Sequence, residues 1–204
     1  DPRRDQVYVL WHRFREEAGA LVPNGLFLDP RRPDGTSARP LQALTFMSTA
    51  TDMAVDRTTG DLYFRTGDAV SRLTVPGGVP LSGFLVGPGA GRLSVGEDGS
   101  VAVTRPADAA VDRYSADGVA LGRTVLAGLV PLDLAADDAD GWRILVRAPV
   151  AADPGAALVV RLAASGAVMG TQLAADIVAP VPAAGAWPWA LDWAAGAGAL
   201  STGS

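Results

Sequence analysis

The acidic run from Asp137 to Gly141 is the densest group of metal-ligating side chains in the sequence. Carboxylates that precede a glycine turn supply the oxygen ligands that a hard cation such as calcium prefers. The run departs from an EF-type loop, because position 136 is Ala and no glutamate follows where a bidentate ligand is needed. We therefore interpret Asp137, Asp138 and Asp140 as a long hairpin turn. A calcium site is the alternative.

Three arginines, Arg72, Arg113 and Arg161, occupy matching positions in a repeated pattern that is described below. A ring of guanidinium groups could bind an anionic ligand, since arginine presents several N–H donors in a fixed geometry. The interpretation that we favour is structural. In it, the side chains point outward or lie between neighbouring repeats and pair with acids such as Asp68 or Asp112.

The remaining composition excludes several kinds of chemistry. The chain has no cysteine and no lysine, so thiol nucleophiles, zinc ribbons, Schiff bases and P-loop lysines are ruled out. His12 is the one histidine, and it has no orienting acid beside it in the sequence. The formal net charge of −5 and the dispersed arginines argue against a nucleic-acid partner. No run of eighteen apolar residues occurs, so we predict no membrane span.

Three of the five tryptophans, Trp187, Trp189 and Trp193, lie close together near the end of the sequence. Tryptophan is enriched at the centres of protein interfaces. One interpretation is that these rings fill the last repeat of the fold. The other is that they dock against a partner subunit.

The elements that must position these residues come from an internal repeat of about forty residues. Each copy reads as an apolar alternation, an acidic turn that contains glycine, and a second alternation; the copies are Met53–Phe64, Leu93–Val103 and Leu132–Val146. The turn glycines Gly60, Gly99 and Gly141 lie 39 and 42 residues apart. A third segment carries the matching arginine, and a further glycine turn leads into a fourth alternation.

Four short antiparallel strands in each unit of about forty residues are typical of a β-propeller blade. We therefore predict an all-β, propeller-like array of about four to five four-stranded blades, either four-bladed or incomplete. An all-β sandwich of hairpins is the rival fold. It would not require arginines in register.

Three regions follow from the repeat. They are residues 1–52, with N-terminal strands and a proline-rich loop that we expect to close the blade array; residues 53–176, with three blades; and residues 177–204, with a degenerate partial blade and a tail rich in Ala, Gly and Trp. In the first region we predict strands at Gln6–Trp11 and Gly25–Leu28, a short helix at Phe14–Ala20 and a loop at Asp29–Pro40.

The segment Gly99–Gly118 resembles an NHL-type propeller blade, in which a D-G turn and a strand are followed by an arginine-containing strand and a second D-G turn. The pattern covers about 120 residues, from Met53 to Leu173. The resemblance implies the propeller fold. Propellers host binding, scaffolding and enzymatic functions alike, so it implies no single activity.

The enzymatic propellers use residues that this chain largely lacks. Gluconolactonase-type propellers use a Glu, an Asn and an Asp on a divalent metal, yet Asn24 is the one asparagine and lies outside the repeats. Streptogramin-lyase-like propellers use a histidine base, and His12 also lies outside them. A metal-dependent hydrolase or lactonase remains the alternative, with the metal held by channel-facing aspartates such as Asp56, Asp112 and Asp133.

The function that we expect is a non-catalytic interaction or structural module without a cofactor. We expect it to be secreted, at a cell surface, or part of a virion such as a virus tail. Its expected partners are protein subunits of an assembly. Neither nucleic acid nor a membrane span is expected.

Overall fold

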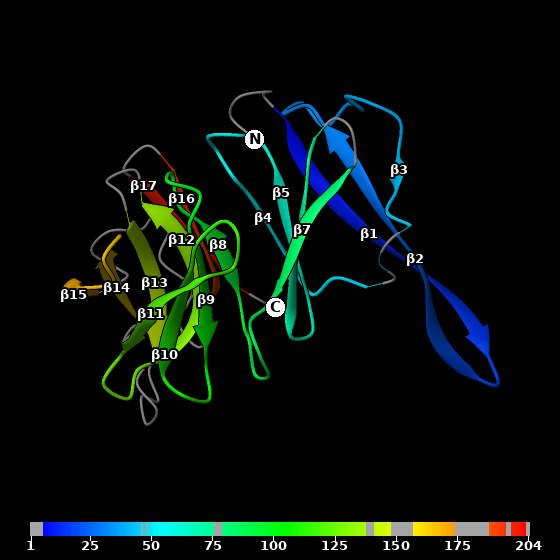
Figure 1. The fold of residues 1–204 in the computed structure, drawn as a ribbon. Coiled ribbons are helices and arrows are strands. Elements are labelled where there is room, and N and C mark those ends of the chain that lie inside the picture. The colour runs from blue at the N-terminus through cyan, green and yellow to red at the C-terminus, as the bar shows by residue number, and fades with distance from the viewer. Residues whose placement is uncertain are drawn as a thin grey trace. The chain divides into compact units, whose positions relative to one another are not determined.

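The computed structural model of the chain is built from β-strands joined by short turns (Figure 1). It describes residues 6–45, 47, 49–75, 79–137, 141–147, 157–173, 188–194 and 197–202, the last two stretches as backbone. The chain divides into two compact units, Asp1–Phe84 and Leu85–Ser204. Each unit is described by itself.

Unit 1 contains a three-stranded and a four-stranded antiparallel sheet, in the orders β1-β2-β3 and β4-β5-β6-β7. The strands are β1 (Val7–Glu17), β2 (Ala20–Arg31), β3 (Gln42–Ala43), β4 (Asp52–Val55), β5 (Leu62–Thr66), β6 (Ala69–Leu73) and β7 (Pro80–Leu85). The paired strands β1 and β2 form a long hairpin that extends away from the rest of the unit (Figure 1).

Unit 2 contains two four-stranded sheets, ordered β8-β9-β10-β11 and β12-β13-β14-β15, and the two-stranded sheet β16-β17. The strands are β8 (Leu93–Val95), β9 (Val101–Arg105), β10 (Ala110–Tyr114), β11 (Ala120–Val125), β12 (Val130–Asp137), β13 (Gly141–Arg147), β14 (Leu158–Ala163), β15 (Val168–Leu173), β16 (Pro188–Ala194) and β17 (Ala197–Thr202). The three four-stranded sheets of the two units coincide with the three repeats, so four strands for each repeat are confirmed.

The predicted helix at Phe14–Ala20 is wrong, because these residues form the far end of the β1–β2 hairpin. Glu17 pairs with Ala20, and the turn between them has positive φ at Ala18 (49°) and Gly19 (80°). A two-residue turn of this kind matches the twist of the strands that it joins. The neighbouring charged residues suggested a helix, but strand pairing overrides that weak local preference.

The three turn glycines do not serve the same purpose. Gly60 and Gly99 have φ of 78° and 77°, a conformation that glycine adopts without steric cost. Gly141 instead begins β13, and a Cβ atom there would lie 2.1 Å from the carbonyl oxygen of Leu162. Strand pairing places Gly141 one position later in its repeat than Gly60 and Gly99 in theirs. Glycine is needed at Gly141 for the close approach of two strands.

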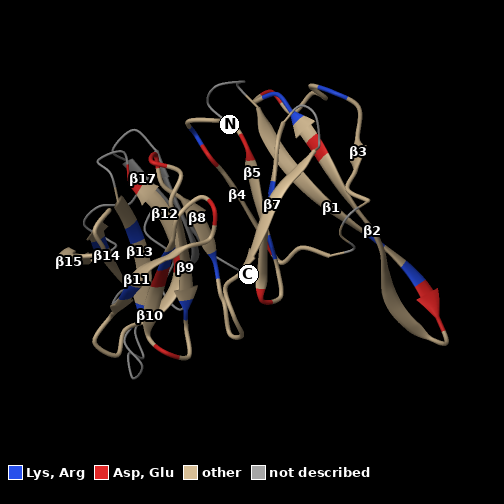
Figure 2. Cartoon of the chain, in the orientation of Figure 1, with Lys and Arg blue, Asp and Glu red and all other residues tan. Residues whose placement is uncertain are grey.

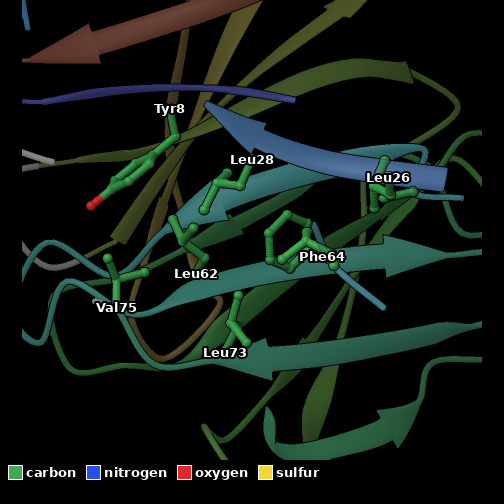
Figure 3. Close-up of a cluster of buried hydrophobic side chains, with 9 residues drawn as sticks. Tyr8, Leu26, Leu28, Leu62, Phe64, Leu73 and Val75 are labelled. Atoms are coloured by element: carbon green, nitrogen blue, oxygen red, sulfur yellow. The ribbon is translucent and has the colours of Figure 1, made fainter. Parts of the chain in front are cut away.

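Each unit has its own apolar core. In unit 1, residues of the three-stranded sheet pack on those of the four-stranded sheet, with Phe64 among Leu28, Leu62 and Leu73 (Figure 3). In unit 2, Trp142 lies in a cluster that joins the two four-stranded sheets. A single twisted sheet cannot bury its own apolar face, so the pairing of sheets makes both cores.

Replacing Phe64 by Ala should destabilise unit 1, because the ring is fully buried and its loss leaves a cavity. We expect the free energy of unfolding to fall by about 3–5 kcal/mol in chemical denaturation. Leu41→Ala, which removes an exposed apolar side chain, is the matched control and should change stability by less than about 0.5 kcal/mol. Equal losses of stability in Phe64→Ala and Leu41→Ala would contradict the position of this core.

Candidate functional site

The repeated arginines all lie on the third strand of their sheets, Arg72 on β6, Arg113 on β10 and Arg161 on β14. Strand pairing places them opposite equivalent residues of the second strands, which are Tyr63, Ala102 and Arg143. The sequence alignment of the three arginines therefore agrees with the register of the sheets.

Arg72 is held within its own sheet. Its Nη2 and Nε atoms donate to Asp61 Oδ2 at 2.7 and 3.0 Å, and its guanidinium lies 5.6 Å from the ring centroid of Tyr63. Desolvation lowers the pKa of Arg72, but the hydrogen bond to Asp61 and the charges of nearby residues together outweigh it, and the net pKa is raised. The partner is Asp61 and not the Asp68 that we had named as an example.

Arg161 is also held by a carboxylate of its own sheet. Its Nε donates to Asp137 Oδ2 at 2.8 Å, and Arg143 Nε lies 3.4 Å from the same oxygen. Asp137 is buried at the end of β12 and engages both guanidinium groups. The other two members of the acidic run, Asp138 and Asp140, lie outside the described residues. A calcium site that includes Asp137 stays a prediction and would have to draw its carboxylate from these arginines.

Arg113 differs from the other two because its own sheet has no acid at the two equivalent hairpin positions. Gly96 and Ser100 stand where the equivalent hairpins have Asp137 and Asp61. Arg113 instead reaches the next sheet, where its Nη1 donates to the carbonyl oxygen of Ala164. A buried guanidinium must find acceptors inside the protein, and here a backbone carbonyl replaces the carboxylate.

This cross-sheet contact depends on Gly166. A Cβ atom on Gly166 would lie 2.5 Å from Arg113 Nε, closer than any side chain tolerates. Gly166 also has a φ of 86°, in the left-handed region. The glycine therefore gives Arg113 room to lie against the turn between β14 and β15.

Asp112, the second acid that we had named for these arginines, pairs with two others. Its carboxylate accepts from Arg105 Nε at 2.7 Å and from Arg123 Nε and Nη2 at 2.6 and 2.9 Å. Burial by itself would raise the pKa of Asp112, but the hydrogen bonds from Arg123 and Arg105 hold it below its ordinary value of 3.8. Arg105 is buried too, whereas Arg123 is exposed, so this triad extends from the interior of unit 2 to its surface.

Arg105 also fixes the segment that leads into β8. Its guanidinium donates to the carbonyl oxygens of Gly87 at 3.0 Å and Pro88 at 2.8 Å, and to that of Val86. The hydroxyl of Tyr114 donates to Val86 as well, at 3.2 Å. These contacts supply hydrogen-bond donors to the carbonyl oxygens of the connecting backbone.

The fourth strands present large apolar side chains to solvent, a feature that the sequence analysis did not identify. These strands are β7, β11 and β15, and the exposed side chains on or beside them are Val79, Leu81, Leu85, Val119, Leu121, Val125, Val168, Met169 and Leu173. Apolar residues stand at positions i, i+2 and i+6 in each case. These are Val79, Leu81 and Leu85; Val119, Leu121 and Val125; and Ala167, Met169 and Leu173. The alternation was visible in the sequence, but the face that solvent contacts was not.

The fourth strands lie at an edge of their sheets and are called the outer strands below. Those of unit 2, β11 and β15, have a bulge at the same place. Arg113 pairs with Gly122, and Arg161 pairs with Gly170. The next residue pair along each ladder leaves one residue of the fourth strand unpaired, which is Leu121 in β11 and Met169 in β15. The additional residue is thus an exposed apolar one followed by glycine. Bulges of this kind redirect a side chain and increase the local twist of the strand.

The remaining candidate residues do not form a single group. His12 is half-buried on β1, and its ring stacks on Phe14 with 6.1 Å between centroids. Asp56 accepts hydrogen bonds from the backbone of Thr58 and from Thr59, and Asp133 is half-buried on β12. Among the described residues, no three acidic or histidine side chains come together as a metal-binding group.

The tryptophan cluster falls at the edge of what the structure describes. Trp187 lies outside the described residues, whereas Trp189 and Trp193 belong to β16, of which the backbone is described. Their role in docking a partner stays a prediction.

Charges are distributed over many elements. Figure 2 shows basic and acidic segments on strands and turns of both units, with one adjacent pair near the far end of the β1–β2 hairpin. Arg15 and Glu17 form an exposed ion pair there, at 2.6 Å. In the part of the chain that the structure describes, no helix is long and apolar enough to span a membrane.

The fold is similar to solved β-propeller structures at low sequence identity. No protein-family model and no curated protein matches the chain. The structure of streptogramin B lyase is 12% identical with a TM-score of 0.55, over 93% of this chain and 66% of that one. Virginiamycin B lyase from Staphylococcus aureus is 14% identical with a TM-score of 0.55, over 89% and 59%.

A third similar structure is hydrazine synthase from Kuenenia stuttgartiensis, 14% identical with a TM-score of 0.53, over 73% of this chain and 46% of that one. The chain thus spans slightly less than two thirds, or a smaller share, of each of these proteins. At such identities the likeness shows the fold alone. The all-β, propeller-like array of four-stranded blades is therefore confirmed.

Asp112→Asn should destabilise unit 2 by about 3 kcal/mol at pH 7, since it leaves Arg105 buried without its carboxylate. The stabilisation that ionised Asp112 provides is complete above the ordinary aspartate pKa of 3.8. It is lost as the pH falls through the lower pKa that Asp112 has in the folded protein. The variant and the unaltered chain are unfolded by chemical denaturant at a series of pH values between pH 2 and pH 7. The difference between their free energies of unfolding should shrink below about pH 4.

The control is Asp117→Asn, which changes an exposed carboxyl in the turn after β10. It should leave stability within about 0.5 kcal/mol of the unaltered chain throughout the series. A difference between Asp112→Asn and the unaltered chain that grows in acid would contradict the depressed pKa.

Proposed function

We propose that this protein is a non-catalytic interaction or structural module of the β-propeller class, which contacts protein subunits of a larger assembly. The three repeated blades form the framework. Their outer strands form the contact surface. The observation that carries the proposal is the recurrence of exposed apolar side chains at matching positions of three different sheets.

The degree of exposure supports this role. Leu85 is 77% exposed, Val125 is 65% exposed and Met169 is 63% exposed. The third strands that precede them in their sheets are buried or half-buried along their length. Single exposed apolar residues are common on any protein surface. A repeated set on one kind of strand is more typical of a surface that a partner covers.

The bulges in β11 and β15 favour contact through side chains over the addition of a strand. A bulge interrupts the ladder and twists the edge away, which protects an outer strand from pairing with another chain. The same bulges have Leu121 and Met169 as their additional residues, and both side chains are exposed. A partner with a complementary apolar surface would cover these groups.

The interior charges support the same proposal. Asp61, Asp112 and Asp137 are each engaged by arginine, which leaves their carboxylates with a structural role. The metal-dependent hydrolase or lactonase that was our alternative would need Asp112 to leave Arg105 and Arg123. Two similar structures are lyases, but His12 of this chain lies on the hairpin strand β1.

We also propose the setting. An acidic chain without cysteine or lysine, built of NHL-like repeats, suits a secreted, cell-surface or virion protein whose neighbours are other subunits. No ligand or cofactor is part of this proposal.

The double variant Leu121→Gln, Met169→Gln tests it. Sedimentation of the unaltered chain over a concentration series should show association, through the outer strands of copies of the chain. The double variant should associate at least about tenfold more weakly, which corresponds to about 1.4 kcal/mol. Its folding is checked by an unchanged denaturation midpoint.

The matched control is Leu41→Gln, which removes an exposed apolar side chain outside the outer strands. It should associate as the unaltered chain does. A chain that stays monomeric at every concentration, or one whose association the double variant leaves unchanged, would count against the proposed role.

A further inference from the structure

An open pocket lies over β14 and β15, the last two strands of the second four-stranded sheet of unit 2 (Figure 1). Its volume is about 220 Å³, which gives room for a ligand of several non-hydrogen atoms. The residues that line it are Arg161, Met169, Gly170, Thr171 and Gln172. Arg161 is the charged member of this set, so the wall of the pocket carries a cation.

Arg161 keeps part of its guanidinium group available. Its Nε atom donates to Asp137 Oδ2 at 2.8 Å, and Arg143 Nε lies 3.4 Å from the same oxygen, so Arg161 shares this carboxylate. Among the described residues, neither Nη atom of Arg161 has a hydrogen-bond partner, and the side chain is 43% exposed. The Nε side of the group thus faces a buried carboxylate, and the two Nη atoms are left to donate to a ligand.

The other two repeated arginines are less accessible. Arg72 donates to Asp61 from both Nε and Nη2, and its side chain is 19% exposed. Arg113 is buried, and its Nη1 donates to the carbonyl oxygen of Ala164. Of the three arginines for which the sequence suggested an anionic ligand, Arg161 is therefore the one that a ligand can reach.

The space beside Arg161 is open because of Gly170, the residue of β15 that pairs with it. A Cβ atom on Gly170 would have no heavy atom within 4 Å beyond its chain neighbours. In the equivalent pair of the other sheet, a Cβ atom on Gly122 would lie 3.3 Å from Arg113 Nη2. The guanidinium group covers the glycine in that sheet, whereas the space over Gly170 stays free.

Gln172 places an amide on the same face. It pairs with Val159, which lies two residues before Arg161 on β14, and side chains two residues apart on a strand share a face of the sheet. Gln172 is exposed, and its side-chain amide has no hydrogen-bond partner among the described residues. A guanidinium group and an amide on one face can donate to the same oxyanion. Met169, which is 63% exposed, adds an apolar wall.

We propose that this pocket binds a small organic carboxylate. Its two oxygens accept from the Nη atoms of Arg161, because a planar guanidinium edge matches the geometry of a carboxylate. The amide of Gln172 donates to one of these oxygens, and the short apolar end of the ligand lies against Met169. This binding needs a single copy of the chain and goes beyond the proposed interaction function.

The test is an NMR titration of the full chain with butyrate, in solution dilute enough that copies of the chain do not associate. Butyrate should shift the signals of the Gly170 backbone amide, the Gln172 side-chain amide and Arg161 Nε–H, with a Kd on the order of 10 mM. Butyramide has the same shape without the charge and should bind at least about tenfold more weakly. The dilute solution separates this binding from contacts between outer strands.

Three variants locate the site. Arg161→Gln removes the proposed donor and should weaken butyrate binding at least about tenfold. Arg147→Gln, which removes an exposed arginine of the same sheet, is the matched control and should leave the Kd unchanged. Gly170→Ala places a methyl group in the open space, where it meets no other group of the fold, and should weaken binding at least about fivefold. It tests the site even if Arg161→Gln does not fold.

Several results would overturn the proposal. If butyrate leaves the signals of Gly170 and Gln172 unmoved, or if Gly170→Ala binds as the unaltered chain does, the ligand does not occupy this pocket. If butyramide or inorganic phosphate binds as tightly as butyrate, the site does not select a carboxylate. If Arg161→Gln and Arg147→Gln have equal effects, the binding reflects the overall charge of the sheet and not a contact with Arg161.

Discussion

A guanidinium group that is removed from water must be given acceptors inside the protein. The third strands of the four-stranded sheets are where this constraint acts, with Arg113 buried and Arg72 and Arg161 half-buried. Arg72 and Arg161 meet it with a carboxylate of their own sheet. Arg113 has no such acid and takes a backbone carbonyl of the next sheet instead. The same repeated residue thus stabilises single sheets in two cases and connects two sheets of unit 2 in the third.

This constraint separates the interior of the blades from their outer edge. Second and third strands are buried or half-buried over most of their length, and many of their polar groups are paired within the protein, as Asp112 is with Arg105. The fourth strands are exposed and free of this requirement, and they carry the apolar residues that we assign to partner contacts. The indole N–H of Trp142 is a polar group in the interior that has no hydrogen-bond partner among the described residues.

The repeat made the framework predictable, whereas contacts across sheets were not. Alternation and turn glycines located the strands of three blades, and arginine spacing placed three residues on equivalent strands. Spacing could not say that Asp61 would be the partner of Arg72, because pairing depends on which strand edges meet. The charge pattern of residues 14–20 predicts a helix at the end of the β1–β2 hairpin, but pairing of the two strands outweighs this local preference. Bulges and the orphaned Trp142 donor have no sequence signal of their own.

In the function that we propose, the outer strands are covered in the assembled protein, while the third strands are protected by their own sheets. Amide hydrogen exchange, resolved by strand and measured below and above the concentration of association, tests this most directly. We expect slow exchange in β10 and β14 at both concentrations, and slower exchange in β11 and β15 once the chain associates. Unchanged exchange in β11 and β15 on association would contradict it.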